Sequence, residues 1–309
     1  MRLRAVVGAA ALAALVWPQV CLACFGARPL AMGGAFVAVA DDVHATYWNP
    51  AGLARLSAAE VGATFDTDWQ DLNYDIFAGV AAPVGARAGA GLLYVFNEDD
   101  LGLQRSRTDH FLQAAAGFMV LPWGGEERGF NLSVGLSGKY IQRTYDYPGV
   151  AEETGEAADL DLAFMLDVGP RVTPRLRMLS LGLLLQNVLE SDFNYGALGR
   201  EQFAVNVRPA VAFRPDAWTV LAAEFYDATE QSGSTVGVRL GAERWLGLGL
   251  GRPVVALRAG AYHVNEESLR AYTFGVGVRP IPQAEFSYAL MYWTEIERTT
   301  HLLAAGWRW

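Results

Sequence analysis

Apolar residues alternate with small or polar ones along much of this chain. Near the carboxyl end, Thr273, Gly275 and Gly277 separate bulky apolar residues at 272, 274, 276 and 278. Successive side chains of a strand point to opposite faces, so this spacing predicts a strand with one bulky apolar face. A soluble strand buries that face in a core, whereas a membrane barrel turns it toward lipid and keeps small and polar residues inside. The alternation therefore favours a transmembrane barrel.

From residue 60 onward, about fourteen segments have this pattern, each ending at glycine, proline or a charged cluster. The expected strands are 60–66, 73–81, 88–96, 110–121, 130–142, 157–168, 177–187, 203–213, 217–226, 234–245, 253–263, 270–279, 283–293 and 299–309. The predicted fold class is all-β, a transmembrane antiparallel β-barrel of about 14 strands over residues 59–309. An even strand number places both ends of the barrel in the periplasm.

The predicted connections alternate in kind. One set is short and proline-rich, at 83–85, 169–174, 214–216 and 279–282, and the other is longer and polar, at 97–109, 144–156, 190–202, 226–233 and 266–270. Short periplasmic turns and longer outer loops are typical of outer-membrane barrels. The connections 121–129 and 246–252 are longer than a tight turn and fit this rule less well.

Charged residues of the predicted strands fall on the face opposite the bulky one. This face is expected to line the lumen, because an Arg or Lys facing lipid at mid-membrane costs about 2–4 kcal/mol. Mutual pairing inside a wet barrel is the simpler role for these residues, and a dedicated substrate site is the alternative. The expected lumen set is Asp159, Asp161, Asp167, Gln186, Arg208, Glu224, Arg239, Glu243, Arg258, Arg279, Glu285 and Arg308.

Aromatic residues near strand ends are expected to form girdles at the two membrane interfaces. The candidates are Trp69, Tyr94, Tyr140, Tyr226, Tyr262, Tyr292 and Trp293. The chain itself ends on Trp309, which resembles the terminal aromatic that serves as an assembly signal of outer-membrane barrels. The barrel assembly machinery is therefore an expected partner.

The first 23 residues have the features of a secretory signal peptide. Arg2 and Arg4 precede an apolar stretch, and a small-residue cleavage site ends at Ala23. Cleavage there would make Cys24 the first mature residue. An incidental cysteine and a lipid anchor are both open, although Cys21 stands where a lipoprotein signal prefers an aliphatic residue.

Net charge and composition exclude some further classes of protein. The formal net charge is −9, which disfavours a nucleic-acid partner. Hydrophobic residues make up 52% of the chain and there are 33 glycines, yet no later run approaches the roughly 18 apolar residues of a spanning helix. A secreted β-sandwich remains the soluble alternative to the barrel.

Residues 24–58 lack the strand pattern and are expected to form an N-terminal hatch or plug segment. Gly33 and Gly34 permit a tight turn, Asp41 or Asp42 can cap a short helix, and Asn49 before Pro50 is typical of a second helix start. The segment is too apolar for a free linker. A barrel of about fourteen strands has a lumen that it could fill.

This segment resembles a known family. The run from Ala31 to Asp42, with Gly33 and Gly34, and the run from Tyr47 to Leu53, with Asn49, Pro50 and Ala51, are similar to the amino-terminal signature of PorV/PorQ-like proteins. These belong to the superfamily of FadL-type transporters of hydrophobic compounds. The resemblance implies a fourteen-stranded barrel with a hatch. The matching residues, which include Asp41 and Asp42, are of turn and cap types and are expected to build the hatch rather than contact a ligand.

Catalytic signatures are weak. The four histidines lack zinc-ligand spacing, the glycines at 247, 249 and 251 precede a turn rather than a helix, and no G-x-S-x-G elbow occurs. Acidic pairs at 99–100 and 152–153 could bind calcium, but solvated acidic loops are the favoured explanation. The expectation is a protein that is not an enzyme and has no cofactor or metal.

The sequence thus predicts an outer-membrane protein that contacts lipid and binds or transports fatty-acid-like hydrophobic small molecules. The resemblance also implies an alternative, a PorV-type component of type IX secretion that contacts other secretion proteins instead of transporting.

Overall fold

The computed structural model describes residues 25–68, 73–102, 105–123, 129–148, 152–169, 178–196, 199–229, 236–249, 252–264, 270–295 and 297–309. The predicted signal peptide at 1–23, Cys24 and Trp69 lie outside these ranges.

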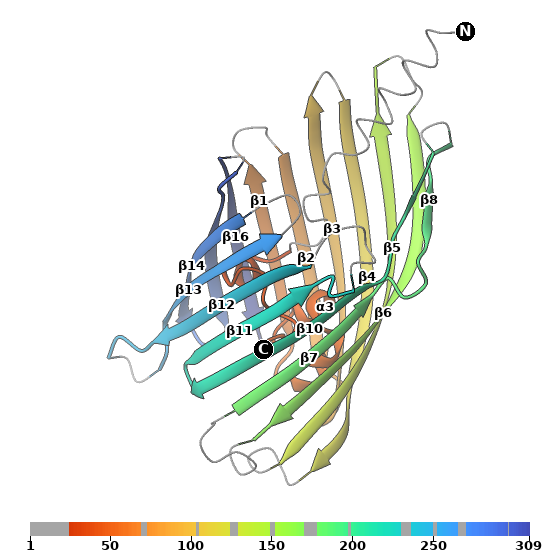
Figure 1. The fold of residues 1–309 in the computed structure, drawn as a ribbon. Helices are drawn as coiled ribbons and strands as arrows, with labels where there is room; N and C mark the ends of the chain where they lie inside the picture. Colours follow the sequence, from red (N-terminus) through yellow and green to blue (C-terminus); the bar gives the residue numbers. More distant parts are fainter. Residues whose placement is uncertain are drawn as a thin grey trace, which may run out of the picture.

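Fourteen antiparallel strands form a closed barrel (Figure 1). In chain order they are β1 (Glu60–Asp68), β2 (Asn73–Pro83), β3 (Ala88–Gly102), β4 (Arg105–Trp123), β5 (Phe130–Asp146), β6 (Glu153–Val168), β7 (Met178–Gln186), β10 (Asn206–Asp216), β11 (Thr219–Tyr226), β12 (Gly237–Leu246), β13 (Val255–Val264), β14 (Arg270–Ile281), β15 (Ala284–Trp293) and β16 (Arg298–Arg308). Each pairs with its sequence neighbour in the barrel, and β1 pairs with β16. The predicted fold class is confirmed.

The barrel has two unlike ends. Tight connections such as the one between Ile281 and Ala284 lie at the turn end, where β1 begins and β16 ends. The connection between β7 and β10 lies at the opposite, loop end, and it contains a small hairpin of β8 (Asp192–Asn194) and β9 (Arg200–Gln202).

Strands β3 to β6 are longer than predicted, and part of the expected loops is wrong. They contain 15, 19, 17 and 16 residues, whereas β7 and β10 to β16 contain 8 to 12. Most of the predicted loop 97–109 continues the ladder between β3 and β4, with Asn97 opposite Asp109 and Asp99 opposite Arg107. The wall formed by β3 to β6 therefore rises above the rest of the loop end, as Figure 1 shows.

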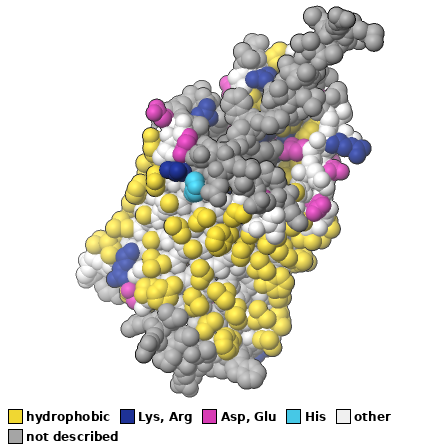
Figure 2. All heavy atoms as spheres, in the orientation of Figure 1, with side chains coloured by type: hydrophobic (Ala, Val, Ile, Leu, Met, Phe, Trp, Pro, Cys, Tyr) yellow, Lys and Arg dark blue, Asp and Glu magenta, His cyan; other side chains and the backbone are white. Residues whose placement is uncertain are grey.

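The outer wall is apolar. Tyr272, Phe274, Val276 and Val278 of β14 are all exposed, whereas Thr273 between them is fully buried. Apolar side chains cover the middle of the face drawn in Figure 2, and most charged side chains on it lie toward the upper end. The bulky residues of the alternating strands thus face outward, as the alternation predicted.

The N-terminal segment, residues 25–57, lies inside the barrel (Figure 1). It contains helix α2 (Ala27–Ala31), helix α3 (Ala45–Trp48) and the 3-10 helix η1 (Pro50–Arg55). Helix α2 packs against β13 to β16, and η1 packs against β2 to β6. In the described part of the chain, no helix has the length and apolarity needed to cross a bilayer.

Candidate functional site

The lumen and the N-terminal segment that fills it form the candidate site. The segment is almost wholly buried, and its turns depend on residues that the sequence singled out. Gly33 and Gly34 have φ angles of 64° and 72°, in the left-handed region that favours glycine. A Cβ at Gly33 would also lie 2.5 Å from the carbonyl oxygen of Leu240. The segment therefore needs glycine here both for its turn and for close approach to β12.

Asn49 caps η1 as expected. Its Oδ1 accepts a hydrogen bond from the amide of Ala51 at 3.0 Å, and Pro50 occupies the first helical position. The Asn49 amide nitrogen also donates to the carbonyl oxygens of Val37, at 2.7 Å, and Phe164 on β6, at 3.3 Å. One side chain therefore joins two turns of the segment to the wall.

The expectation that Asp41 or Asp42 caps a helix is wrong. Helix α3 begins after His44 and has no side-chain cap. Asp42 instead accepts hydrogen bonds from the amide and the ring of His44, both at 2.9 Å, and pairs with Arg28 at 2.7 Å. Its role is to close a turn and to hold an arginine.

Glycines of the inner wall form the socket for the segment. A Cβ added at Gly135 would lie 2.2 Å from the amide nitrogen of Ala51, and one at Gly260 would lie 2.2 Å from that of Gly33. Such distances are far below van der Waals contact, so the wall and the segment meet backbone to backbone. The wall glycines with a Cβ site within 2.9 Å of the segment are Gly62, Gly89, Gly91, Gly117, Gly135, Gly182, Gly241, Gly260 and Gly275.

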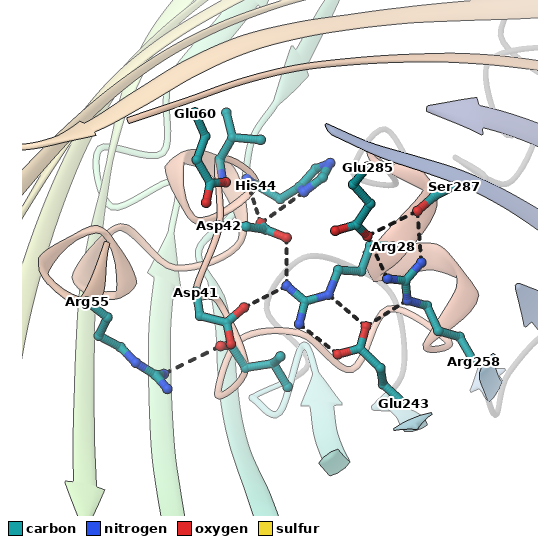
Figure 3. A network of polar contacts seen from close by, with 12 residues as sticks. Arg28, Asp41, Asp42, His44, Arg55, Glu60, Glu243, Arg258, Glu285 and Ser287 are labelled. Carbon is teal, nitrogen blue, oxygen red and sulfur yellow. Dashed lines mark hydrogen bonds and ion pairs between the residues drawn. The ribbon is translucent and has the colours of Figure 1, made fainter. Parts of the chain in front are cut away.

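Arg28 joins the segment to the wall near the turn end (Figure 3). Its guanidinium lies 2.6 Å from Asp41 and 2.7 Å from Asp42 within the segment, and 2.9 Å from Glu243 on β12. Glu243 also pairs with Arg258 on β13 at 2.7 Å. Burial alone would lower the pKa of Arg28, but the three carboxylates outweigh burial and raise it well above its usual range. Arg28 therefore stays charged.

The same contacts shift the pKa values of the two carboxylates of the segment, Asp42 and Asp41. Burial alone would raise the pKa of Asp42, but the charges of His44 and Arg28 outweigh it and hold that pKa well below its usual range. Burial alone would also raise the pKa of Asp41, but the charges of Arg28 and Arg214 outweigh burial and lower that pKa. Both groups are carboxylates near neutral pH.

A second polar cluster holds the segment on the adjoining strands β10 to β12. Glu224 on β11 is 1% exposed and accepts hydrogen bonds from the amides of Phe36 and Val37, both at 3.1 Å. Its other oxygen lies 2.5 Å from Arg208 on β10 and 3.5 Å from Arg239 on β12. One carboxylate therefore joins three strands, β10, β11 and β12, to the segment.

Three further residues of the predicted lumen set, Arg279, Glu285 and Arg308, also form ion pairs. Arg279 pairs with Glu285 at 2.7 Å, and Arg308 pairs with Glu60 at 2.7 Å. Glu285 also pairs with Arg258, at 2.9 Å. Every arginine of the predicted set thus lies within 4 Å of a carboxylate, which agrees with the pairing role. Among the described residues, no group of three or more metal-ligating side chains is found.

Three expected girdle residues point the other way. Tyr226 and Tyr262 lie with their rings 4.4 and 4.8 Å from the Arg239 guanidinium, and Trp293 is 6% exposed and packs against Tyr262. Tyr226 and Tyr262 stack on a lumen arginine and Trp293 is buried against Tyr262, so the girdle assignment of all three is wrong. Tyr94, Tyr140 and Tyr292 are exposed on the outer wall, as a girdle requires.

A buried cluster of apolar side chains that the sequence did not reveal lies along the inner face of β4 and β5. We call it the inner column. Near the loop end, Tyr145 contacts Tyr195 beside the β8–β9 hairpin, with ring centroids 5.2 Å apart. Deeper in the lumen, Phe111 contacts Phe25 at 5.9 Å, and Ile141 is its cross-strand partner. The inner column comprises Phe25, Tyr47, Phe111, Ile141, Tyr145, Phe193 and Tyr195, which all belong to one buried cluster.

Arg143 lies within the inner column, between Ile141 and Tyr145 on β5, and together with Glu201 it fastens the hairpin. Arg143 is fully buried, pairs with Asp109 at 2.7 Å and with Glu201 at 2.9 Å, and lies 5.3 Å from the ring of Phe193. Tyr195 donates to Glu201 at 3.1 Å. The hairpin therefore covers the column in this conformation. The alternation of side chains along β4 and β5 was the only sequence signal that could have placed Phe111 and Tyr145 on the inner face. The contacts with the hairpin depend on tertiary structure and have no such signal.

These features define the class of the protein: an outer-membrane β-barrel whose lumen is filled by its own N-terminal segment. A closed barrel with an even strand number and an apolar outer wall is the architecture of the bacterial outer membrane. The turn end is accordingly periplasmic and the loop end extracellular.

Solved structures share this fold. The toluene transporter TbuX of Ralstonia pickettii is similar with a TM-score of 0.63 and 12% identity, over 94% of this chain and 99% of that one. The toluene transporter TodX of P. putida has a TM-score of 0.61 at 11% identity, over 93% and 99%. A FadL homologue of Pseudomonas aeruginosa has a TM-score of 0.57 at 10% identity, over 89% and 96%. No protein-family model and no curated protein matches the sequence.

Proposed function

We propose that this protein carries hydrophobic small molecules across the outer membrane. The observation that supports this most is the inner column, which extends from the extracellular hairpin to the N-terminal segment. Lumens of open porins are polar and water-filled, so a lumen that contains this aromatic cluster suits a solute that leaves water readily. The fold that this chain shares with two toluene transporters agrees with the proposal.

The N-terminal segment would act as the hatch. A hydrophobe at the inner column reaches Phe25 and Tyr47, which belong to the segment itself. On the other side the segment is held by Arg28 and Glu224, whose contacts are ionic and directional. We infer that the segment moves at its apolar side while the polar contacts hold it in the barrel.

Uptake measurements test the proposal. Labelled toluene and a labelled long-chain fatty acid would be supplied to a bacterial host that lacks its own hydrophobe channels. Cells with the folded protein should take up at least one of them faster than cells without it. Phe193→Ser should lower that rate roughly tenfold, equivalent to about 1.4 kcal/mol, because it removes apolar surface from the column. Equal uptake with and without the protein would contradict transport.

Leu189→Ser is the matched control. Leu189 lies in the same connection between β7 and β10 but is 58% exposed, outside the column. Its replacement should leave uptake unchanged. If both variants lower uptake equally, the effect belongs to the connection as a whole and not to the column.

The resemblance of the segment to PorV/PorQ-like proteins supports a different proposal, a role in protein secretion. In that case, loss of the protein should abolish display of exported proteins at the cell surface and leave hydrophobe uptake intact. The structural comparisons favour transport.

A further inference from the structure

The outer wall carries a groove at the seam where the barrel closes. The groove has a volume of about 660 Å³ and lies over β1, β2, β14, β15 and β16. Its floor is formed by Ala63 and Ala305, which face each other across the β1–β16 ladder. Phe65, Phe286 and Leu303 rise around them and are 44%, 55% and 61% exposed. Two small side chains between bulky ones therefore make a hollow in an otherwise convex wall.

The inner side of the same wall shows that the groove is not an exit for a solute transported through the lumen. A small cavity of about 50 Å³ lies there, lined by charged residues that include Arg28, Glu60 and Arg308. Four residues line both the cavity and the groove, namely Ala63, Ser287, Ala304 and Ala305, so only the sheet separates them. The ladder across this seam is unbroken from the pair Glu60–Arg308 to the pair Asp68–Thr300. A hydrophobe would have to pass charges and break that ladder, so the groove is open to the bilayer alone.

The shape and height of the groove indicate the occupant. Two convex barrel walls meet along a narrow line, so a second copy of the protein would leave this hollow empty, and a void loses contacts. A flexible acyl chain can fill it. The volume lies in the range of small-molecule sites, about 300–1,000 Å³. Trp307, 46% exposed, follows Ala305 on the same face toward the periplasmic end, at the level where aromatic girdles mark the interface.

We propose that this groove binds one acyl chain of a phospholipid from the periplasmic leaflet. The proposal rests on the membrane location of the barrel and not on what the barrel transports. It predicts a lipid that stays at the β1–β16 seam longer than at other parts of the wall.

The test uses the full protein in nanodiscs of phosphatidylethanolamine and phosphatidylglycerol that contain a phospholipid with a photoreactive diazirine in mid-chain. After irradiation, mass spectrometry maps the labelled residues. Labelling at Leu303 and Phe286 should exceed labelling at Leu240, an exposed residue of β12 outside the groove, by roughly tenfold, the factor that about two additional buried methylene groups supply. Equal labelling at all three residues would overturn the proposal.

Variants of the floor complete the test. Ala305→Phe should fill the groove and reduce labelling of Leu303 to the level of Leu240. Ala259→Phe on β13, which is also exposed on the outer wall, should leave it unchanged. If Ala305→Phe does not show the gel shift of a folded barrel, Ala63→Leu serves instead. Labelling that persists in a folded, filled variant overturns the proposal, as does a disulfide-linked dimer formed efficiently by Ala63→Cys, which would make the seam a contact between copies.

Discussion

Replacing Glu224 by glutamine is expected to loosen the N-terminal segment while the barrel stays closed. One carboxylate oxygen of Glu224 accepts from Arg208, and the other accepts from the amides of Phe36 and Val37. Each carboxylate oxygen therefore faces hydrogen-bond donors only. In glutamine one of the two oxygens is replaced by NH₂, which is itself a donor, so one set of donors loses its acceptor in either orientation of the amide.

The expected cost follows from these contacts. Hydrogen bonds that involve a charged group contribute about 1.5–3 kcal/mol each, and loss of one partner of a buried ion pair costs about 3–5 kcal/mol. Glutamine keeps one good acceptor, so we expect the lower end, about 3 kcal/mol. At about 1.4 kcal/mol per factor of ten, this predicts local opening that is roughly 150-fold more frequent.

Hydrogen exchange read by mass spectrometry measures this directly, because Phe36 and Val37 report through their own amides. Peptides that cover residues 30–45 should exchange roughly 150-fold faster in Glu224→Gln under conditions where exchange reports the opening equilibrium. Peptides from β3 to β6 should be unchanged. Heat-modifiable migration on a gel would show that the barrel itself is folded.

Asp109→Asn is the matched control. Asp109 is also a buried carboxylate, and it pairs with Arg143 and Arg107, which both belong to the wall. Exchange in residues 30–45 should stay within about twofold of the parent protein, as for distant sites that share no partner. Unchanged exchange in Glu224→Gln, or an equal increase in both variants, would refute the reasoning that Glu224 specifically holds the segment.

Three further outcomes are expected. Gly135→Ala should lower the yield of folded barrel on a heat-modifiability gel, because its Cβ would lie 2.2 Å from the Ala51 amide, whereas Gly138→Ala meets nothing closer than 3.6 Å and should fold normally. Because the pKa of Asp42 is lowered, its own ionisation contributes fully to stability above about pH 4, and this contribution is lost on further acidification. The difference in thermal midpoint between the parent and Asp42→Asn should therefore shrink as the pH falls below about 4. Trp309→Asp should reduce insertion by the assembly machinery, and normal insertion in cells would count against an assembly role for this residue.

Much of the barrel could be predicted because each strand has one face in lipid. The exposed Phe274 and Val276 alternate with inward residues, and a period of two needs no knowledge of the partner strand. The extracellular ends of β3 and β4 broke this rule. Asn97, Asp99 and Asp100 are polar regardless of face because they lie beyond lipid, so the sequence there has the composition of a loop although the ladder continues.

The lumen was harder to predict than the wall. Inward charges could be placed on the correct face, but their partners depend on register and on the segment, as Glu224 shows by joining Arg208 to Phe36. Tyr226 and Tyr262 were misassigned for a related reason. An aromatic side chain near a strand end suits either a girdle or a stack on a buried arginine, and only the face distinguishes the two.

The ladder between β1 and β16 also constrains the order in which this protein can fold. Glu60 and Arg308 are partners although they lie at opposite ends of the barrel sequence, so the cylinder cannot close before the last strand arrives. The segment precedes β1, and the wall approaches it to within backbone contact at Gly135 and Gly260. Such close contacts form most readily while the sheet is still an open curl. We therefore expect the segment to be in place before the slow, long-range closure of the β1–β16 seam.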